Sequence, residues 1–349
     1  MEKVKIDDVL KYEQPTKYIV ETENYDDSYN TPVLTAGKSF LLGYTNEEKG
    51  VFNEVPVIIF DDFTTSFHFV DFPFKVKSSA LKILKAVKDK ADIKYLYYKM
   101  QTIKFEAEQH KRYWISKYSQ IEIPLPSIAT QQRIAAILDQ SDAIIQNNRA
   151  IVQKYDALTQ SLFLDMFGDP VKNEKGWEKK KLGIVTNMKA GKFIAASDIF
   201  SENSNEMFPC YGGNGLRGFV KSNTHEGEFV LIGRQGALCG NVRVTNGKFH
   251  ATEHAIVCSP IMKYQTLWLY YLLKMMNLNR FATGAAQPGL NVGTLVDLEI
   301  MIVPYDIQNQ FAERVAMIEA QKQQAQLELA KSEELFQSLL QKAFKGELS

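Results

Sequence analysis

The chain has 349 residues, of which 45% are hydrophobic and 23% are charged, and its formal net charge at pH 7 is zero. This balance is that of a folded protein, it excludes a disordered or collagen-like chain, and the length suffices for two domains. The first residues carry charges but no apolar signal core, and no stretch approaches the roughly 18 uninterrupted apolar residues of a membrane span. We therefore expect a cytoplasmic protein.

The first region, residues 1–127, has the pattern of a mixed α/β domain. Strand-like runs lie at 55–60 and 66–70. Short helices are predicted at 80–88 and 93–101.

Residues 128–169 predict one long helix. From Thr130, a candidate N-cap, apolar residues recur about every 3.5 positions, and Gly168 stands where a helix would end. A helix of about 40 residues exceeds the usual globular length, which favours a paired helix. The residues expected in the seam are Ile134, Leu138, Ile145, Val152 and Leu162.

The third region, residues 170–304, again predicts a mixed α/β domain. Strand-like runs lie at 228–233 and 254–259, a short helix is predicted at 266–276, and the segment 211–215 reads YGGNG, a glycine-rich turn. Residues 305–349 then repeat the long-helix pattern and end near Gly346. Its expected seam residues are Phe311, Val315, Leu329 and Phe336.

The second half of the chain repeats the first. A shift of about 177 residues superposes Gln131 on Gln308 and Phe167 on Phe344, and 121–126 on 298–303, whereas the middles of the halves diverge. Duplicates related by a two-fold axis would run their helices antiparallel. We predict an α+β chain: two α/β domains (1–127 and 170–304) in pseudo-two-fold symmetry, joined by two long antiparallel coiled-coil helices (128–169 and 305–349). The alternative is that each helix packs only on its own domain.

No catalytic or metal-binding motif stands out. The chain has no phosphate-binding glycine loop and no C-x-x-C pair, and Cys210, Cys239 and Cys258 are expected to be buried free thiols. Asp61, Asp62, Asp71 and Lys75 come nearest to a nuclease cluster, but turn and strand-end residues are the plainer interpretation. His250 and His254 lie in a strand-like run, where a spacing of four does not suit one tetrahedral ion.

Basic residues are in excess outside the two helical segments. Each helical segment carries two more acidic than basic residues, so the remainder carries four more basic than acidic ones. Lys and Arg neutralise phosphates, while Arg, Asn and Gln pair with base edges. The candidate DNA-binding residues are Lys38, Tyr44, Lys75, Lys77, Tyr211, Asn214, Arg217, Lys221, Arg234, Gln235 and Gln287.

Four segments resemble the specificity subunits of type I restriction-modification systems: IEIPLPSIATQQRIAAIL at 121–138, SLFLDMFGDP at 161–170, 231–256 and 284–304. The resemblance covers essentially the whole chain. It departs most in the first domain, where FDDFTTSFHFV replaces GRQGALCGNV.

This resemblance implies a non-catalytic DNA-reading subunit for a bipartite double-stranded target. It further implies two methyltransferase (modification) subunits around the helices, one restriction subunit, and S-adenosylmethionine, ATP and magnesium on those partners, with no cofactor or metal in this chain. Two alternatives remain open, a stand-alone two-headed DNA-binding scaffold and a metal-dependent nuclease.

Overall fold

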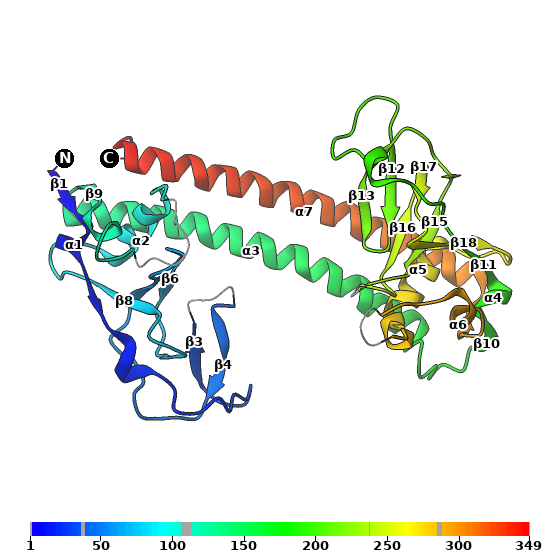
Figure 1. Ribbon diagram of the computed structural model, residues 1–349, viewed down its shortest axis with the longest axis horizontal. Helices are drawn as coiled ribbons and strands as arrows, with labels where there is room; N and C mark the ends of the chain where they lie inside the picture. Colours follow the sequence, from blue (N-terminus) through cyan, green and yellow to red (C-terminus); the bar gives the residue numbers. More distant parts are fainter. Residues whose placement is uncertain (1, 36–38, 106–112, 237, 285–287, 349) are drawn as a thin grey trace. The chain divides into compact units, whose positions relative to one another are not determined.

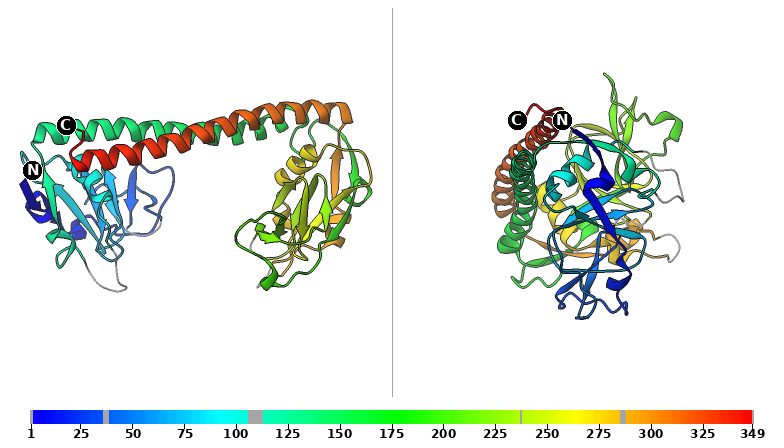
Figure 2. Two further views of the ribbon diagram at one scale, coloured as in Figure 1. Left: turned by 90° about the horizontal axis from the view of Figure 1, so that it is seen from above. Right: turned by 90° about the vertical axis from the view of Figure 1, so that its left-hand side faces the viewer.

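The computed structural model describes residues 2–35, 39–105, 113–236, 238–284 and 288–348 and contains two compact units. One unit comprises residues 1–149 and 327–349, and the other comprises residues 150–326. Two long helices, α3 (Ile128–Phe167) and α7 (Tyr305–Lys345), contribute residues to both units (Figure 1, Figure 2). Each unit is compact on its own.

The globular part of the first unit, here the first module, contains two sheets and a strand pair. The sheets have the strand orders β2-β8-β5-β6 and β4-β3-β7, and β1 pairs antiparallel with β9. Its elements are β1 (Glu2–Lys5), α1 (Ile6–Val9), β2 (Leu10–Glu13), η1 (Pro15–Tyr18), β3 (Thr31–Leu34), β4 (Leu41–Thr45), β5 (Val57–Asp61), β6 (Phe67–Val70), β7 (Lys75–Val76), β8 (Leu81–Ala86), α2 (Ile93–Gln101), η2 (Tyr118–Gln120) and β9 (Glu122–Leu125).

The second module repeats this topology with one additional strand, β14, at the end of its second sheet. Its sheets have the orders β11-β18-β15-β16 and β13-β12-β17-β14, and β10 pairs with β19, so the duplication seen in the sequence extends to the strand order. Its elements are β10 (Glu178–Lys181), α4 (Leu182–Val185), β11 (Thr186–Ala190), η3 (Ala196–Asp198), β12 (Phe208–Gly212), β13 (Gly215–Val220), β14 (His225–Glu226), β15 (Phe229–Gly233), β16 (Val242–Thr245), β17 (Lys248–Ala251), β18 (Ala255–Pro260), α5 (Thr266–Met275), η4 (Leu278–Phe281), α6 (Val292–Val296) and β19 (Glu299–Ile302).

The mixed α/β content of both halves and the two long helices were predicted correctly, but the helix expected at 80–88 is wrong. That segment forms β8, the strand between β2 and β5 in the four-stranded sheet. Leu81, Ile83 and Leu84 are fully buried there. Burial on both faces of a central strand gives a continuous apolar run that resembles a helix, and tertiary pairing overrides local propensity.

One glutamine near the start of each long helix, Gln131 in α3 and Gln308 in α7, bonds that helix to its module through the same pair of hydrogen bonds. The Gln131 Oε1 accepts a hydrogen bond from the Asp92 backbone N–H at 2.8 Å, and its Nε2 donates to the Pro126 carbonyl at 2.8 Å. Gln308 does the same with the Gln265 N–H at 2.9 Å and the Val303 carbonyl at 2.7 Å. Both glutamines are buried, and Asp92 and Gln265 are the N-cap residues of α2 and α5. The sequence repeat therefore marks a structural joint.

Within the first unit, α3 and α7 pack antiparallel. Ile134, Leu138 and Ile145 of α3 share a core with Phe336 and Leu340 of α7 and with the first module. Leu329 packs against this core and is partly buried. These α3 residues thus contact both the partner helix and the module, which combines the two packing modes considered from the sequence.

Within the second unit, the other halves of the same helices also run antiparallel. The Phe311 ring lies 5.6 Å from that of Phe163 and 5.1 Å from that of Phe167, and the Lys322 ammonium lies 2.6 Å from the Asp156 carboxylate. Contact positions that rise along α3 therefore fall along α7. Of the remaining expected seam residues, Val315 is buried, and Val152 and Leu162 are partly buried.

The N-terminus of α3 differs from the prediction. The helix begins at Ile128, and the Ser127 hydroxyl oxygen accepts a hydrogen bond from the Thr130 N–H at 3.3 Å. Ser127 therefore takes the capping role that the sequence suggested for Thr130. At the other end, Gly168 adopts a φ of 80° and donates its N–H to the Leu164 carbonyl, as the glycine predicted. No helix of the described residues is long and apolar enough to cross a membrane.

Candidate nucleic-acid interface

Several loops of the second module lie at the same end of the strands in the β11-β18-β15-β16 sheet. The last residue of β11, Ala190, pairs with Ile256, and the last residue of β15, Gly233, pairs with Ala255 at the start of β18. The loop after β11, the loop after β15 and the turn before β18 therefore meet. We call this end of the second module the recognition edge.

Close backbone approaches hold these loops together. The Arg234 N–H donates to the His254 carbonyl at 2.9 Å, and the turn residue Gly213 packs beside both segments. A Cβ on Gly233 would lie 2.2 Å from the Gly213 carbonyl oxygen, and one on Gly213 would lie 3.0 Å from the His254 oxygen. Only glycine permits the contact at Gly233, and a side chain on Gly213 would be tightly packed, so the turn at 211–215 lies close to the backbone of the neighbouring loops.

Polar side chains from these loops surround one open hollow of about 330 Å³. Asn214 and Arg217 come from the β12–β13 hairpin, Gln235 follows β15, and His254 precedes β18. Asn214, Arg217 and Gln235 are exposed. Their amide and guanidinium groups are the donors and acceptors that read base edges. The sequence indicated Asn214, Arg217 and Gln235 separately, and the fold brings them together around this hollow, with Arg234 next to Gln235 in the chain.

The arginines of this edge are not committed to ion pairs. Within the described residues, no carboxylate lies at ion-pair distance from Arg217, Arg234 or Arg243. His254 contacts Glu253, with 3.1 Å between its Nε2 and the Glu253 Oε1. The positive charge of these arginines is thus available for an anionic ligand such as a phosphate.

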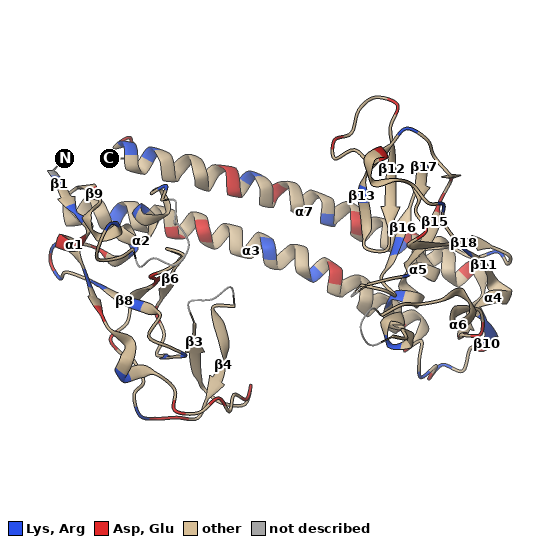
Figure 3. Ribbon diagram, viewed as in Figure 1, with Lys and Arg blue, Asp and Glu red and all other residues tan. Residues whose placement is uncertain are grey.

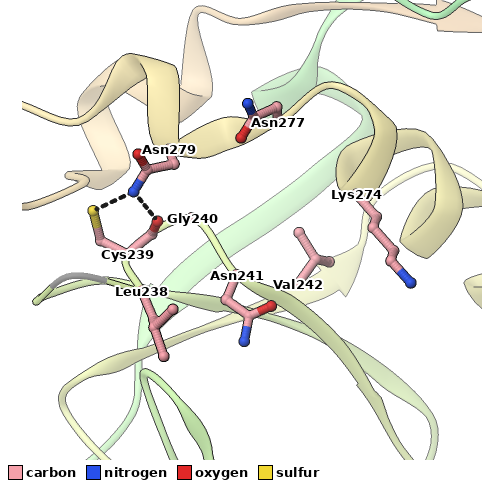
Figure 4. A pocket seen from close by; sticks show the side chains of 8 residues that line it. All are labelled: Leu238, Cys239, Gly240, Asn241, Val242, Lys274, Asn277 and Asn279. Carbon is pink, nitrogen blue, oxygen red and sulfur yellow. Dashed lines mark hydrogen bonds between the residues drawn. The ribbon is translucent and has the colours of Figure 1, made fainter. Parts of the chain in front are cut away.

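The loop after β15 is anchored to η4 by a buried cysteine and an asparagine (Figure 4). The Asn279 Nδ2 donates to the Cys239 carbonyl at 2.9 Å and lies 3.4 Å from its Sγ. A Cβ on Gly240 would lie 2.5 Å from the Asn279 backbone nitrogen. This anchoring holds the loop that carries Arg234 and Gln235. All three cysteines are free and buried, as expected, and burial raises the pKa of Cys258 to about 12.

Two other expected DNA contacts of the second module line separate hollows. Tyr211 lies with Leu216 and Arg243 on a hollow of about 520 Å³ that also includes α5 and α7 residues. Its ring packs edge-on against Phe249 at 5.9 Å. Lys221 lines a third hollow with Phe200, and its ammonium lies 5.7 Å from that ring.

In the first module, the two described lysines that were expected to contact DNA form ion pairs with glutamates. Lys75 is buried, pairs with Glu47 at 2.8 Å and donates to the Lys49 carbonyl at 2.6 Å, so its ammonium is not free for a phosphate. Lys77 pairs with Glu23, and Tyr44 is half-buried in β4. The expectation for Lys75 is therefore wrong, because a distant carboxylate captures it. Lys38 and Gln287 lie outside the described residues.

Two of the acidic residues that suggested a nuclease, Asp61 and Asp62, have structural partners, and Asp71 is exposed. The Asp62 carboxylate accepts hydrogen bonds from the Tyr113 and Trp114 N–H groups at 3.1 and 2.9 Å and lies 3.5 Å from the buried Lys82 ammonium. Asp61 caps its own turn by accepting from the Phe63 N–H at 2.8 Å. Within the described ranges, no three His, Cys, Asp or Glu residues form a group that could hold a metal ion.

The two histidines considered as a metal pair are separated by a turn. His250 lies in β17, and His254 precedes β18, so the single strand expected here is two strands. The ring of His250 is 5% exposed, and its Nε2 lies 3.2 Å from the Lys192 carbonyl oxygen. His254 instead lines the hollow at the recognition edge, whereas His250 is buried; a satisfied or groove-facing histidine was the interpretation favoured over a metal ligand.

The long helices carry both signs of charge (Figure 3). In the first unit Arg149 pairs with Glu333 at 2.6 Å, and in the second unit Lys322 pairs with Asp156 at 2.6 Å. These pairs join α3 to α7 within each unit. The helices therefore lack the concentrated positive charge that a phosphate backbone would require.

Comparison with known proteins identifies the family. Residues 1–154 and 174–329 match the model of the type I restriction modification DNA specificity domain, so the chain belongs to this family. It is 50% identical over 149 residues to the Escherichia coli EcoR124I/EcoR124II specificity subunit, which is 39% of this chain and 37% of that one. It is 38% identical over 183 residues to the E. coli EcoprrI specificity subunit, 51% of this chain and 46% of that one.

Solved structures share the fold. The S subunit of a type I restriction-modification system from M. genitalium has a TM-score of 0.66 at 18% identity, covering 98% of this chain and 96% of that one. A chain from a study of complex assembly in the type I R-M system has a TM-score of 0.57 at 16% identity, covering 99% and 98%. The aligned part spans less than half the length of the two E. coli relatives.

Proposed function

We propose that the chain is the DNA-reading specificity subunit of a type I restriction-modification complex and that it contains no catalytic centre of its own. Each module would read one half of a bipartite double-stranded target. The observation that carries the proposal is the recognition edge, where Asn214, Arg217 and Gln235 line one hollow and the Arg234 backbone is bonded to His254. Membership of the specificity-domain family supports the same conclusion.

The recognition edge suits DNA on chemical grounds. Arginine and the side-chain amides offer bidentate contacts to guanine and adenine, and each good pair contributes about 1–3 kcal/mol of discrimination against the wrong base. Free cations such as Lys221 would neutralise phosphates and set the register. In the first module we propose Tyr44 and Lys77 as contacts and omit Lys75, because it is buried.

The long helices would set the distance between the modules. We propose the division 1–127, 128–169, 170–304 and 305–349 into recognition domain, helix, recognition domain and helix. A 40-residue helix is about 60 Å long, since each residue adds about 1.5 Å. The outer faces of these helices would dock two modification subunits, and a restriction subunit would join that complex in the cytoplasm. S-adenosylmethionine, ATP and magnesium would then be bound by those partners.

Selection from a randomised duplex library tests this function. The full chain, co-expressed with modification subunits of a type I system, is expected to enrich duplexes with two fixed half-sites and a spacer of constant length. Enrichment of one contiguous site would contradict the bipartite reading, and enrichment of no sequence would contradict DNA recognition itself.

The same preparations separate the two alternatives. A stand-alone scaffold would purify without modification subunits and still bind both half-sites, whereas a specificity subunit is expected to co-purify with them. A nuclease would cleave DNA alone in the presence of divalent metal. We expect no cleavage by the isolated chain, because Asp61 and Asp62 serve a turn and a buried ion pair.

A further inference from the structure

Phe193 is the most exposed large hydrophobic side chain of the described residues, with 76% of its surface accessible. It lies in the loop between β11 and η3, which leaves the recognition edge of the second module. An exposed aromatic ring gains no burial in the free protein, and a ring at this position can become buried only when a ligand covers it.

The loop that carries Phe193 is held at its root. The Gly191 N–H donates to the Ala255 carbonyl at 2.9 Å, and the Lys192 N–H donates to the Ala251 carbonyl at 2.8 Å. The buried His250 ring contacts the Lys192 carbonyl on the other side at 3.2 Å. The same 251–255 segment fastens Arg234 through the His254 carbonyl. Phe193 is therefore anchored to the backbone that also anchors the proposed base-reading arginine.

The surroundings of Phe193 fit the edge of a nucleic acid. Phe193 borders a hollow of about 370 Å³ whose lining also includes Ile194, Asp198, Phe200, Lys221, Ser222 and His250. Lys192, next to Phe193, is exposed. Cations beside an apolar ring match phosphates beside a base, whereas an apolar protein partner would leave these charges unsatisfied.

We propose that Phe193 is an apolar wedge that stacks against one base step of the half-site bound by the second module. The proposal rests on the proposed DNA-reading function. Proteins that kink DNA insert apolar side chains between base steps in this way, and base-aromatic stacking is tolerant of sequence. The equivalent loop of the first module begins the short helix η1 at Pro15, so the wedge belongs to the second module alone.

The test uses the full chain with its modification subunits and the duplex selected from the randomised library. 2-Aminopurine replaces each adenine of the second module's half-site in turn, because its fluorescence rises when the base unstacks. The wild type is expected to brighten at one step. Phe193→Ala should lose this signal and bind about 5- to 150-fold more weakly, while Phe193→Trp should retain both.

The control is Ile261→Ala, which removes an equally apolar side chain that is 59% exposed beyond the end of β18, at the opposite edge of the sheet. It should bind and brighten like the wild type. A Phe193→Ala protein that still unstacks the base overturns the wedge, and so does one that binds weakly when the wild type gives no signal. A library that enriches no sequence overturns the DNA-reading function itself, and the wedge with it.

Discussion

The two modules place opposite charges at the same position of the same topology. Asp62 follows β5 in the first module, and Arg234 follows β15 in the second. The backbone carbonyl of each accepts a hydrogen bond from the segment that returns after the module helix, from Tyr113 at 2.9 Å and from Leu290 at 2.8 Å. The Asp62 side chain turns inward to Lys82, whereas Arg234 is half-exposed at the recognition edge and forms no ion pair within the described residues.

The two modules thus differ in where their basic side chains lie. Buried lysines of the first module complete ion pairs inside it, Lys75 with Glu47 and Lys82 with Asp62. The arginines of the second module remain available on its surface. The basic residues of a duplicated framework can therefore be buried in ion pairs in one copy and lie on the surface in the other.

Lys82→Ala should have the largest effect on stability. The change leaves the Asp62 carboxylate buried with its charge unpaired, which costs about 3–5 kcal/mol of unfolding free energy. Denaturant unfolding of the full chain, followed by fluorescence of the buried Trp114, measures this loss. The matched control Lys88→Ala removes an exposed lysine of the same module and should leave unfolding unchanged. Equal stability of both variants would show that the Asp62 pair is not structural.

Replacing Gln131 and Gln308 tests whether both glutamines stabilise their modules equally. Gln131→Ala and Gln308→Ala should each cost about 1–3 kcal/mol, because buried backbone groups lose their partners. Thermal unfolding of each variant is compared with Gln140→Ala, an exposed position in α3. Similar losses at 131 and 308 would support an equivalent joint, and a loss at one position alone would contradict it.

Arg234→Ala should leave stability unchanged and weaken DNA binding by about 1–3 kcal/mol, with relaxed preference at one base pair of the second half-site. Titration with the selected duplex and with its single-base variants, at one moderate salt concentration, measures both effects. Binding equal to that of the wild type would remove Arg234 from the interface.

A smaller effect should appear at acid pH in the first module alone. Burial opposes ionisation of Glu47, but hydrogen bonds from Lys75 and from the Thr22 and Glu21 N–H groups outweigh it and lower its pKa to about 2. A carboxyl with a lowered pKa stabilises the fold above its ordinary value of 4.5, and this contribution is lost as the pH falls toward 2.

Hydrogen exchange of the β4 and β7 peptides should therefore accelerate over that pH range. Glu47→Gln should flatten the dependence by removing the titrating group. If the wild-type exchange profile lacks this acid-dependent change, the Glu47–Lys75 pair contributes little to the module.

Local pattern predicted the repeated framework because its signals are periodic. The 3.5-residue spacing predicted both long helices, and the alignment of Gln131 with Gln308 marked the duplication, but the hydrogen bonds that these glutamines make were found only in the structure. The local sequence pattern could not predict contacts between distant residues. Lys75 pairs with Glu47, and the segment 80–88 contains the central strand β8 because it pairs with distant strands. The YGGNG glycines hinted at close backbone contact, but nothing local distinguished Phe193, whose exposure is a property of the folded loop.

The most direct test of the account changes the length of both helices together. One heptad is inserted between Arg149 and Ala150 and one between Lys331 and Ser332, which keeps the Asn148–Ser332 and Asp156–Lys322 contacts within their own units. Each heptad adds about 10 Å, which corresponds to up to about three base pairs. Selection from duplexes with randomised spacers should return the same half-sites with a longer spacer. A folded variant that binds both original half-sites at the original spacing would contradict the claim that the helices set the distance.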